Sequence, residues 1–442
     1  MQTYQALLQK FISFKTISND TNMHVEMINC VTWLKELFDN ANFDTEIWSG
    51  YGNDILFANY KSKKPNAKTI LIYGHYDVQP ADLTDGWDFE PFELHESEDR
   101  LFARGVIDDK GQLLIHIYTI LALLNKNQSL DFNIKFLIEG DEETGSDKLE
   151  SCIIHEKDKL TADIAIVSDG ELRGIDNPTI SGGYRGFLNM SIKILGLKND
   201  LHSGIYGGLI PNPAIFLTKA LSDLINWDNS LNLPGFYEGI VPLTSFEETA
   251  TSENIPTFEE IYELTGTPFL VGELGYNYLR RTGFRPTLQI SGIKAGFVED
   301  GYKNIIPATA EVKLNIRLVE GQNESKIGRL LEDYFLDRLN DFHLTIDVRE
   351  GANATKINFD NKYFPEIERC ISNVYKIKPT INYSGGSLPV SGYLKKHITE
   401  NLFFLNLANE DCNMHGVNEN FHKRSLQLAL SLSKELFTNI FQ

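Results

Sequence analysis

The chain has 442 residues, of which 42% are hydrophobic and 23% are charged, so it is long enough for two or three domains with cores of their own. Its formal net charge of −20 disfavours nucleic acid and anionic membranes as partners, because both require basic surfaces. The four cysteines are scattered and form no CxxC pair, so neither a thiolate zinc site nor a disulfide framework is expected.

The amino-terminal segment, residues 1–14, lacks the basic start, the long apolar run and the cleavage site of a signal peptide. No stretch approaches the ~18 consecutive apolar residues that a membrane-spanning helix needs. The cytoplasm is therefore the expected location. Apolar residues instead recur at helical spacing, which predicts two amphipathic helices. They are Leu7, Leu8, Phe11 and Phe14 in the first helix, and Val25, Ile28, Val31, Leu34 and Leu37 in the second.

Three short apolar runs then predict strands that are buried on both faces. They are Thr69–Tyr73, Ile134–Ile138 and Ile164–Val167. The apolar stretch Leu113–Leu124 lies between the first two runs and is long enough for a helix. Strands that alternate with helices predict an α/β sheet.

The pattern changes after about residue 181. Leu188–Leu195 and Glu311–Val319 alternate between apolar and polar residues, as strands with one covered face do. A helical segment, Ser325–Leu339, separates the second of these from another strand, His343–Val348. The region between residues 226 and 285 gives no clear prediction. This block is expected to be a separate α+β module.

The α/β pattern returns after about residue 351. Phe364–Tyr375 and Leu426–Phe441 have helical spacing, and Leu402–Leu407 is a buried strand. We therefore expect one domain, residues 1–181 and 353–442, to be split in sequence by an inserted domain, residues 182–352.

Potential metal ligands lie after each apolar strand of the first domain. The segments are Gly74–Asp77, Glu139–Glu143 and Ser168–Gly170, and His415 follows the strand at 402–407. In open α/β sheets, binding sites gather beyond the carboxyl ends of strands. The shared placement therefore predicts a single site.

His75 and Asp77 are two residues apart and point the same way in extended backbone. A metal-bound imidazole usually needs a carboxylate or a carbonyl at its other nitrogen, and Asp77 could supply it. Alternatively, Asp77 could bind metal itself. Taken alone, His75 is more often a structural histidine.

Two pairs of adjacent acids carry the chemistry further. Asp108-Asp109 lies between a glycine turn and an apolar helix, and Glu142-Glu143 lies at the end of a strand. Neighbouring acids ordinarily repel and stay in water, so each pair could be a solvated turn. A cation changes this, because a carboxylate with two oxygens can bridge two metal ions. One glutamate could then bind metal while its neighbour accepts a proton from water, which requires a raised pKa.

These motifs occur in an order that resembles the M20 metallopeptidases. They are His75–Asp77, Asp108–Gly111, Glu142–Ser146, Ser168–Gly170 and His415. The inserted module falls in the long interval before His415, as it does in that family. The chain also resembles the cytosolic nonspecific dipeptidase and carnosinase branch at several further segments. They are Asp200–Gly204, Gly207-Gly208, Asn304–Pro307, Ile316–Leu318 and Gly385–Pro389.

The resemblance implies a two-domain architecture, in which an α/β zinc-peptidase catalytic domain carries an inserted α+β lid or dimerisation domain. It also implies a complete site. Asp108 would bridge two divalent ions, with His75 and Asp169 on one ion and Glu143 and His415 on the other. Asp77 would orient His75, Glu142 would be the general base, and His202 would stabilise the oxyanion, reaching the site from the partner subunit of a homodimer. Arg317, Gly386 and Ser387 would bind the carboxylate end of the substrate.

The expected function is hydrolysis of the amide bond in a dipeptide or a related small N-acyl amino acid by metal-activated water. Zn²⁺ suits a site of Asp, Glu and His ligands, and Mn²⁺ or Co²⁺ would also fit. Two departures from the dipeptidase branch leave room for an N-acyl-amino-acid deacylase or a desuccinylase. They are Tyr383-Ser384 in place of an Arg-Glu pair and Glu320 in place of a proline. A catalytically silent metal-binding protein is the remote alternative.

Overall fold

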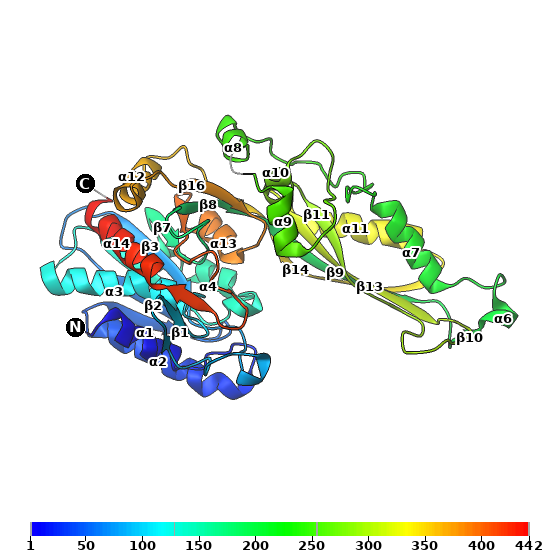
Figure 1. Cartoon of the computed structure of the whole chain (residues 1–442), viewed down its shortest axis with the longest axis horizontal. Helices are drawn as coiled ribbons and strands as arrows, with labels where there is room; N and C mark the ends of the chain where they lie inside the picture. The colour runs from blue at the N-terminus through cyan, green and yellow to red at the C-terminus, as the bar shows by residue number, and fades with distance from the viewer. Residues whose placement is uncertain (1, 128, 253–254, 441–442) are drawn as a thin grey trace. The chain divides into compact units, whose positions relative to one another are not determined.

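The computed structural model describes residues 2–127, 129–252 and 255–440, which form two compact units (Figure 1). The first unit comprises Met1–Gly182, Ile357–Asn382 and Tyr393–Gln442. The second comprises Gly183–Lys356 and Tyr383–Gly392. The sequence places residues 353–356 and 383–392 in the first domain, whereas they pack with the second unit.

A mixed sheet, with nine strands among the described residues, organises the first unit. Its order is β1-β2-β6-β3-β7-β17-β8-β15, and β16 also pairs with β8. The strands are β1 (Asp44–Trp48), β2 (Ile55–Tyr60), β3 (Thr69–His75), β6 (Asn133–Glu139), β7 (Ile164–Val167), β8 (Thr179–Tyr184), β15 (Thr355–Lys356), β16 (Thr380–Ser384) and β17 (Leu402–Leu405). A small sheet, β18-β5-β4, lies apart from it, with β4 (His95–Glu96), β5 (Arg100–Phe102) and β18 (Asn420–His422).

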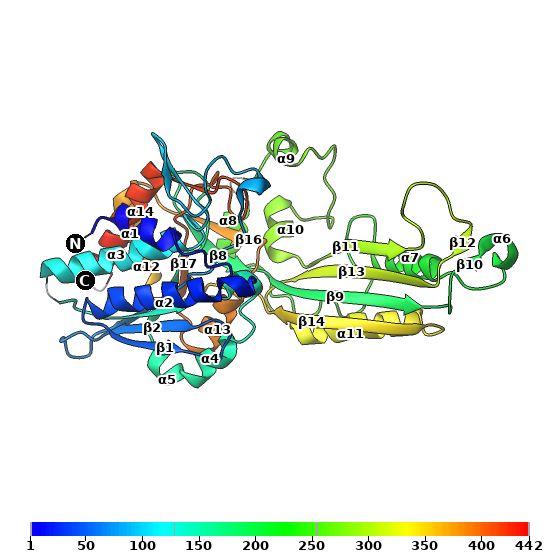
Figure 2. The ribbon, with the colours of Figure 1, turned by 90° about the horizontal axis from the view of Figure 1, so that it is seen from below.

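The centre of the large sheet is parallel, since β3 pairs in parallel with both β6 and β7, and β7 pairs in parallel with β17. Helices cover these apolar strands. They are α1 (Tyr4–Ile12), α2 (His24–Asp39), α3 (Lys110–Asn127), α4 (Leu149–His155), α5 (Lys157–Leu160), α12 (Phe364–Tyr375), α13 (Pro389–His397) and α14 (Lys423–Asn439). Helix α3 packs against α1 and α14, and α2 packs against β1 and β2 (Figure 2). Burial of both sheet faces accounts for the unbroken apolar runs of these strands.

The second unit is built on an antiparallel sheet in the order β11-β13-β9-β14. Its strands are β9 (Gly186–Leu195), β11 (Thr287–Ala295), β13 (Thr309–Leu318) and β14 (His343–Ala352). Leu188, Met190, Ile192 and Ile194 alternate along β9 and face a core that helices α7 (Pro213–Leu224) and α11 (Glu324–Arg338) complete. The remaining elements are β10 (Leu201–His202), β12 (Ile305–Ile306), α6 (Ser203–Tyr206), α8 (Ser245–Ala250), α9 (Phe258–Thr265) and α10 (Tyr278–Phe284).

The predicted α/β first part and the α+β insertion are both confirmed. The predicted strands and helices correspond to β3, β6, β7, β9, β13, β14, β17, α1, α2, α3, α11, α12 and α14, with ends shifted by a few residues. Residue 441, the predicted end of the last helix, lies outside the described residues. Phe14 was predicted in the first helix but follows its end at Ile12.

Candidate metal centre

The candidate ligands lie at one edge of the large sheet. His75 is the last residue of β3, Glu143 lies in the 3-10 turn Glu142–Thr144 after β6, and Asp169 follows the end of β7 at Val167. These three strands are parallel neighbours, so their carboxyl ends share an edge. Asp108 lies in the turn that leads into α3, which begins at Lys110.

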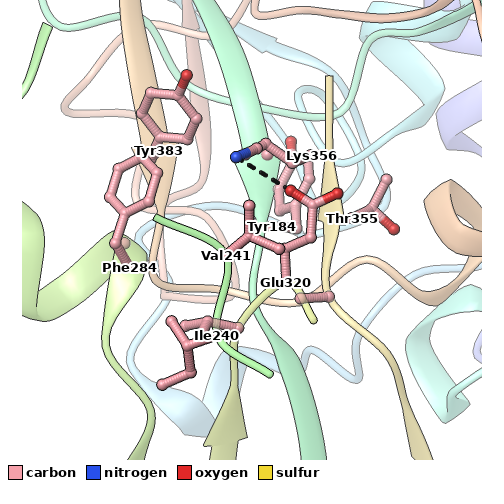
Figure 3. Close-up of a pocket in the computed structure, with 12 residues that line it drawn as sticks. Tyr184, Ile240, Val241, Phe284, Glu320, Thr355, Lys356 and Tyr383 are labelled. Carbon is pink, nitrogen blue, oxygen red and sulfur yellow. Dashed lines mark ion pairs between the residues drawn. The ribbon is translucent and has the colours of Figure 1, made fainter. Parts of the chain in front are cut away.

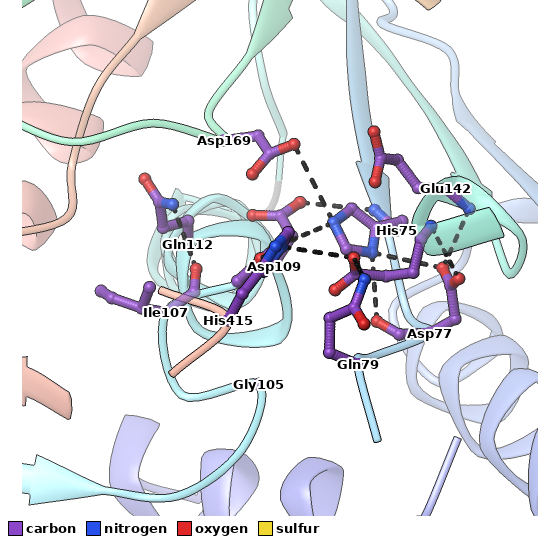
Figure 4. Close-up of polar contacts among 12 residues, drawn as sticks. His75, Asp77, Gln79, Gly105, Ile107, Asp109, Gln112, Glu142, Asp169 and His415 are labelled. Atoms are coloured by element: carbon purple, nitrogen blue, oxygen red, sulfur yellow. Dashed lines mark hydrogen bonds and ion pairs between the residues drawn. The ribbon is translucent and has the colours of Figure 1, made fainter. Parts of the chain in front are cut away.

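The side chains form two groups that share Asp108. Figure 4 shows His75, Asp169 and His415 of these groups close to one another. One group is His75, Asp108 and Asp169, and the other is Asp108, Glu143 and His415. In each group, one potential ligand atom per residue lies within 4.8 Å of the others. The structure therefore brings all five predicted ligands together.

Asp108 offers a different oxygen to each histidine. Its Oδ1 lies 3.1 Å from Nε2 of His75, and its Oδ2 lies 2.8 Å from Nε2 of His415. The other contacts are longer, with His415 Nε2 3.3 Å from Glu143 Oε2 and His75 Nε2 3.9 Å from Asp169 Oδ2. This is the arrangement that a bridging carboxylate needs.

The charges of the cluster shift the pKa values of its members. Hydrogen bonds to Asp108 and Glu143 raise the pKa of His415 to about 10. Burial, reinforced by the charge of Asp108, raises the pKa of Asp169 to about 7. Burial also acts to raise the pKa of Asp108, but hydrogen bonds from His415 and His75 outweigh it and hold the pKa below its usual range. Acids packed this closely need positive charge between them, and the all-oxygen and nitrogen donor set suits divalent cations.

Asp77 is buried beside His75 and contacts two parts of the cluster. Its Oδ1 lies 3.2 Å from Nδ1 of His75, whose Nε2 faces Asp108. Its two oxygens also accept hydrogen bonds from the backbone N–H groups of Glu142, at 3.2 Å, and Glu143, at 3.0 Å. One carboxylate thus holds an imidazole and the turn after β6 in a fixed relation.

Glu142 lies beside the ligands but in neither group. Burial raises the pKa of its carboxyl well above the usual value, although the charge of His75 opposes the shift. The neighbouring acids Asp169 and Asp108 act in the same direction as burial. A carboxyl group with a raised pKa can take and return a proton near neutral pH.

An ion pair that the sequence did not reveal fixes the Asp108 turn to the His415 loop. Glu419 is fully buried, and its carboxylate accepts from Nη1 of Arg104 at 2.7 Å and from the backbone N–H groups of Gly105, Ile107 and Asp108. Nη2 of Arg104 donates to the carbonyl of His415 at 3.3 Å. Glu419 shortly follows His415 in a polar stretch, but only the fold shows that its partners lie at residues 104–108.

Two further acids from the predicted segments lie beside the ligands, although the sequence gave neither of them a role. Asp109 is buried, and its Oδ2 accepts from the backbone N–H of His75 at 3.3 Å. Its Oδ1 has no hydrogen-bond partner within the described part of the chain. Glu139 accepts hydrogen bonds from the hydroxyls of Tyr73 and Ser146, and burial raises its pKa to about 7.

The other predicted site residues belong to the second unit. Arg317, on β13, donates from Nη1 to the hydroxyl of Ser387 at 2.7 Å, and Gly386 is exposed beside it. His202 is exposed at the end of β10, where its Nδ1 accepts from the backbone N–H of Gly204 at 3.0 Å. Arg317, Gly386 and Ser387 are therefore brought together within this unit.

The two predicted departures, Glu320 and Tyr383, line one pocket of the second unit (Figure 3). Nζ of Lys356 lies 3.1 Å from Glu320 Oε2 and 2.9 Å from Glu247 Oε1. The hydroxyl of Tyr383 donates to the same Oε1 of Glu247 at 3.4 Å. The two departures therefore belong to one charged cluster around Lys356.

Comparison with known sequences identifies relatives over most of the chain. The model of peptidase family M20/M25/M40 matches residues 71–439. The Cys-Gly metallodipeptidase dug1 of Schizosaccharomyces pombe is 31% identical, over 84% of this chain and 77% of its own length. The human Beta-Ala-His dipeptidase is also 31% identical, over 81% of this chain and 72% of its own length.

Solved structures give the same picture of the fold. An M20 family metallo-carboxypeptidase from Sulfolobus solfataricus superposes with a TM-score of 0.88 at 27% identity, covering 100% of this chain and 99% of its own. The dipeptidase Dug1p of Saccharomyces cerevisiae gives a TM-score of 0.81 at 25% identity, covering 99% and 96%. Both similarities span the two units, as expected for the two-domain architecture predicted from the sequence.

Proposed function

Because the chain belongs to peptidase family M20/M25/M40, we propose that it is a metal-dependent hydrolase that cleaves the amide bond of dipeptides or closely related small N-acyl amino acids. The single observation that carries this proposal is the pair of ligand groups that share Asp108. Relatives named for hydrolysis of Cys-Gly and of Beta-Ala-His support dipeptides as the substrate class.

The residues present fit two divalent ions. His75 and Asp169 would hold one ion, Glu143 and His415 the other, and Asp108 both, since its two oxygens already face the two imidazoles. Zn²⁺ accepts both imidazole and carboxylate ligands and is the ion proposed here, and Mn²⁺ or Co²⁺ would also fit. When bound, a pair of such ions lowers the pKa of a shared water and polarises a carbonyl.

The chain's own groups would handle the proton and the substrate. Glu142 would accept the proton of the attacking water and return it to the leaving amine, which its raised pKa allows. Asp77 would keep His75 and the Glu142 turn in register through the contacts described above. Arg317 and Ser387, with the backbone at Gly386, would bind the carboxylate of the substrate.

His202 would stabilise the oxyanion from the partner subunit of a homodimer formed through the inserted unit. Its side chain is exposed, and its Nε2 has no partner among the described residues, as suits a residue that acts across an interface. Large apolar side chains are also exposed on α6, α7 and the segment between them, and a second copy of the chain would cover them. They are Ile205, Leu209, Ile215 and Phe216.

The expected location, the cytoplasm, rests on sequence features and on the cysteines. Cys30, Cys152, Cys370 and Cys412 are all buried as free thiols, which suits a reducing compartment. Within the described ranges, no helix is long and apolar enough to cross a membrane.

An N-acyl-amino-acid deacylase or a desuccinylase-like enzyme is the second candidate, because Glu320 and Tyr383 depart from the dipeptidase branch. Both residues have local partners in the cluster around Lys356, so their presence is explained without an acyl-binding role. The dipeptidase proposal is therefore preferred.

A substrate panel with zinc-loaded protein tests the proposal. Dipeptides are set against N-acetyl and N-succinyl amino acids, and kcat/KM is measured for each. The proposal requires dipeptides to be hydrolysed with the highest kcat/KM. Preference for an N-acyl amino acid would support the second candidate, and absence of turnover on every compound would contradict both.

A further inference from the structure

Arg185 is a second arginine beside the Gly385–Ser387 loop of the second unit, and no motif pointed to it. It lies between β8 and β9, and its backbone N–H donates to the carbonyl of Gly386 at 2.9 Å. Its Nε donates to the carbonyl of Gly385 at 3.1 Å. Backbone and side chain of one residue therefore grip two successive peptide groups of the loop.

The fit around Gly385 is close. A Cβ atom there would lie 3.1 Å from Nη2 of Arg185 and 3.3 Å from the carbonyl oxygen of Thr282. A side chain at this position would crowd the guanidinium, so glycine favours the close approach of the loop. Arg185 thus fixes the backbone that leads directly into Ser387.

Arg185 and Arg317 lie at the same end of the sheet. Arg317 is directly opposite Thr287 on β11 and Phe187 on β9. The hydroxyl of Thr287 accepts from Nη1 of Arg185 at 3.5 Å, while Nη1 of Arg317 donates to Ser387 at 2.7 Å. The two cations therefore flank the Gly385–Ser387 loop, one holding its start and the other its end.

Neither guanidinium is paired with an acid in the part of the chain that the structure describes. Among the described residues, no carboxylate oxygen lies within 4.0 Å of Arg185 or Arg317, whereas the nearby Arg285 is paired with Glu273 at 2.5 Å. Burial, reinforced by the charge of Arg317, lowers the pKa of Arg185 to about 10. Burial lowers the pKa of Arg317 as well. Two partly desolvated like charges are unfavourable unless an anion joins them.

We propose that Arg185 and Arg317 form one carboxylate-recognition site, in which Arg317 contacts the anion and Arg185 positions the Gly385–Ser387 loop and adds the second charge. The inference rests on the proposed function and deepens it, because it makes Arg185 a further residue on which recognition of the substrate's carboxylate depends. Carboxylates match the planar donors of guanidinium groups, and a neutral amide gains little from the paired charge.

Binding rather than turnover provides the test, so the result does not depend on catalysis. A zinc-loaded Glu142→Gln protein is titrated calorimetrically with alanyl-alanine and with its carboxy-terminal amide. We expect the acid to bind roughly 10- to 100-fold more tightly than the amide, as charge-assisted hydrogen bonds allow. Adding Arg185→Met should remove most of that preference, and Arg185→Lys, which keeps the charge, should retain part of it.

Arg280→Met is the matched control, because Arg280 is a partly buried arginine of the same unit that donates to the hydroxyl of Thr251. It should leave both affinities unchanged. Equal affinity for the acid and the amide in the parent protein, or a preference that survives Arg185→Met, would overturn the inference. Equal weakening of both ligands would also overturn it, since that is the signature of a distorted unit. Failure of the proposed function appears separately, as lack of alanyl-alanine hydrolysis by the wild-type protein.

Discussion

At the scale of single residues, the proposed site depends on carboxyl groups whose surroundings give them different protonation states. Two imidazoles hold the pKa of Asp108 below its usual value, and burial raises the pKa of Glu142 above its usual value. Such opposite shifts in neighbouring acids suit one as a ligand and the other as a proton carrier. Asp77 joins them, because it contacts His75 and the backbone of Glu142.

Replacing Glu142 with alanine should separate metal binding from catalysis. Dipeptide turnover is expected to fall by roughly 10²- to 10⁴-fold, the contribution of a general base, while the bound metal per chain stays the same. Steady-state kinetics and elemental analysis of the same preparations measure the two quantities. Glu150→Ala is the control, because Glu150 is an acid that forms ion pairs with His397 and Lys396 instead of contacting the metal ligands. Near wild-type turnover in Glu142→Ala would show that the base is another group.

Buried His116 should make stability depend on pH. Its nitrogens contact the hydroxyls of Ser168 and Ser433, and burial lowers its pKa to about 4 from an ordinary value of 6.5. The unfolded chain therefore binds the proton more readily than the folded chain does. The contribution of neutral His116 to the free energy of unfolding is fully present above pH 6.5 and is lost as the pH falls towards 4. The loss attributable to His116 is about 3 kcal/mol.

Urea unfolding of wild-type and His116→Gln protein between pH 4 and 7 measures this effect. The difference in unfolding free energy between the two proteins should change over that range by most of the expected amount. A difference that is independent of pH would mean that His116 is not held neutral in the folded state.

At the scale of elements, parallel strands bring candidate ligands to one edge of the sheet, and a buried ion pair fixes the Asp108 turn to the His415 loop. The strands β3, β6 and β7 could be predicted because each is an unbroken apolar run followed by polar residues. The ion pair between Arg104 and Glu419 could not be predicted, because the two residues are far apart in sequence. They meet only when β18 pairs with β5.

Substitution of Glu419 should affect both stability and metal binding. Glu419→Ala leaves the buried Arg104 cation without its carboxylate partner and removes the acceptor of Nη1 of Arg104 and of three backbone N–H groups, which should cost about 3–5 kcal/mol. The milder Glu419→Gln keeps an acceptor oxygen and should fold, but with a higher Kd for zinc, because the Asp108 and His415 segments are no longer fixed. Thermal denaturation and competition with a zinc chelator check these results.

Asp176→Asn is the matched control, because the ion pair of Asp176 with Arg424 is exposed and should contribute less than about 1 kcal/mol. Unchanged zinc affinity in Glu419→Gln would show that the ion pair does not position the ligands.

Helix faces and the middle region show where sequence reasoning stopped. Val25 and Ile28 supported the prediction of α2, yet they are 64% and 42% exposed, and the core side is formed by Met27, Cys30, Val31, Leu34 and Phe38. Two overlapping periodicities predict a helix, but they do not show which of its faces packs against the core.

The segment around α8 and α9 gave no prediction, although each helix begins with a capping box, Thr244 with Glu247 and Thr257 with Glu260. That signal was present in the sequence.

At the scale of the whole molecule, the candidate metal ligands belong to the first unit, and the residues proposed to bind the carboxylate belong to the second. The order and spacing of motifs predicted the five residues that the structure brings together in the two candidate ligand groups, even His415, whose Met414-His415-Gly416 context departs from the family. The side-chain contacts of the Gly385–Ser387 loop could not be predicted, because this loop belongs to a late segment of the sequence that packs with the inserted unit. Arg185 has no motif of its own, and only its contacts with that loop reveal it.

The proposed homodimer gives a prediction at this scale. Sedimentation equilibrium at micromolar concentration should give twice the 50.1 kDa mass of the chain. Leu209→Asp, which places a charge on the exposed apolar set at α6 and α7, should shift the mass towards that of one chain and reduce turnover, because His202 would no longer reach a partner's site. Leu195→Asp, at an exposed position on β9, is the control. A wild-type monomer with full activity would contradict the dimer.

The metal content of wild-type and Asp108→Ala protein tests the central claim most directly. Elemental analysis after saturation with zinc and removal of free metal should give two ions per wild-type chain. Asp108 belongs to both ligand groups, so its loss should bring the bound metal towards zero. Retention of two ions by Asp108→Ala would contradict a centre organised around this carboxylate.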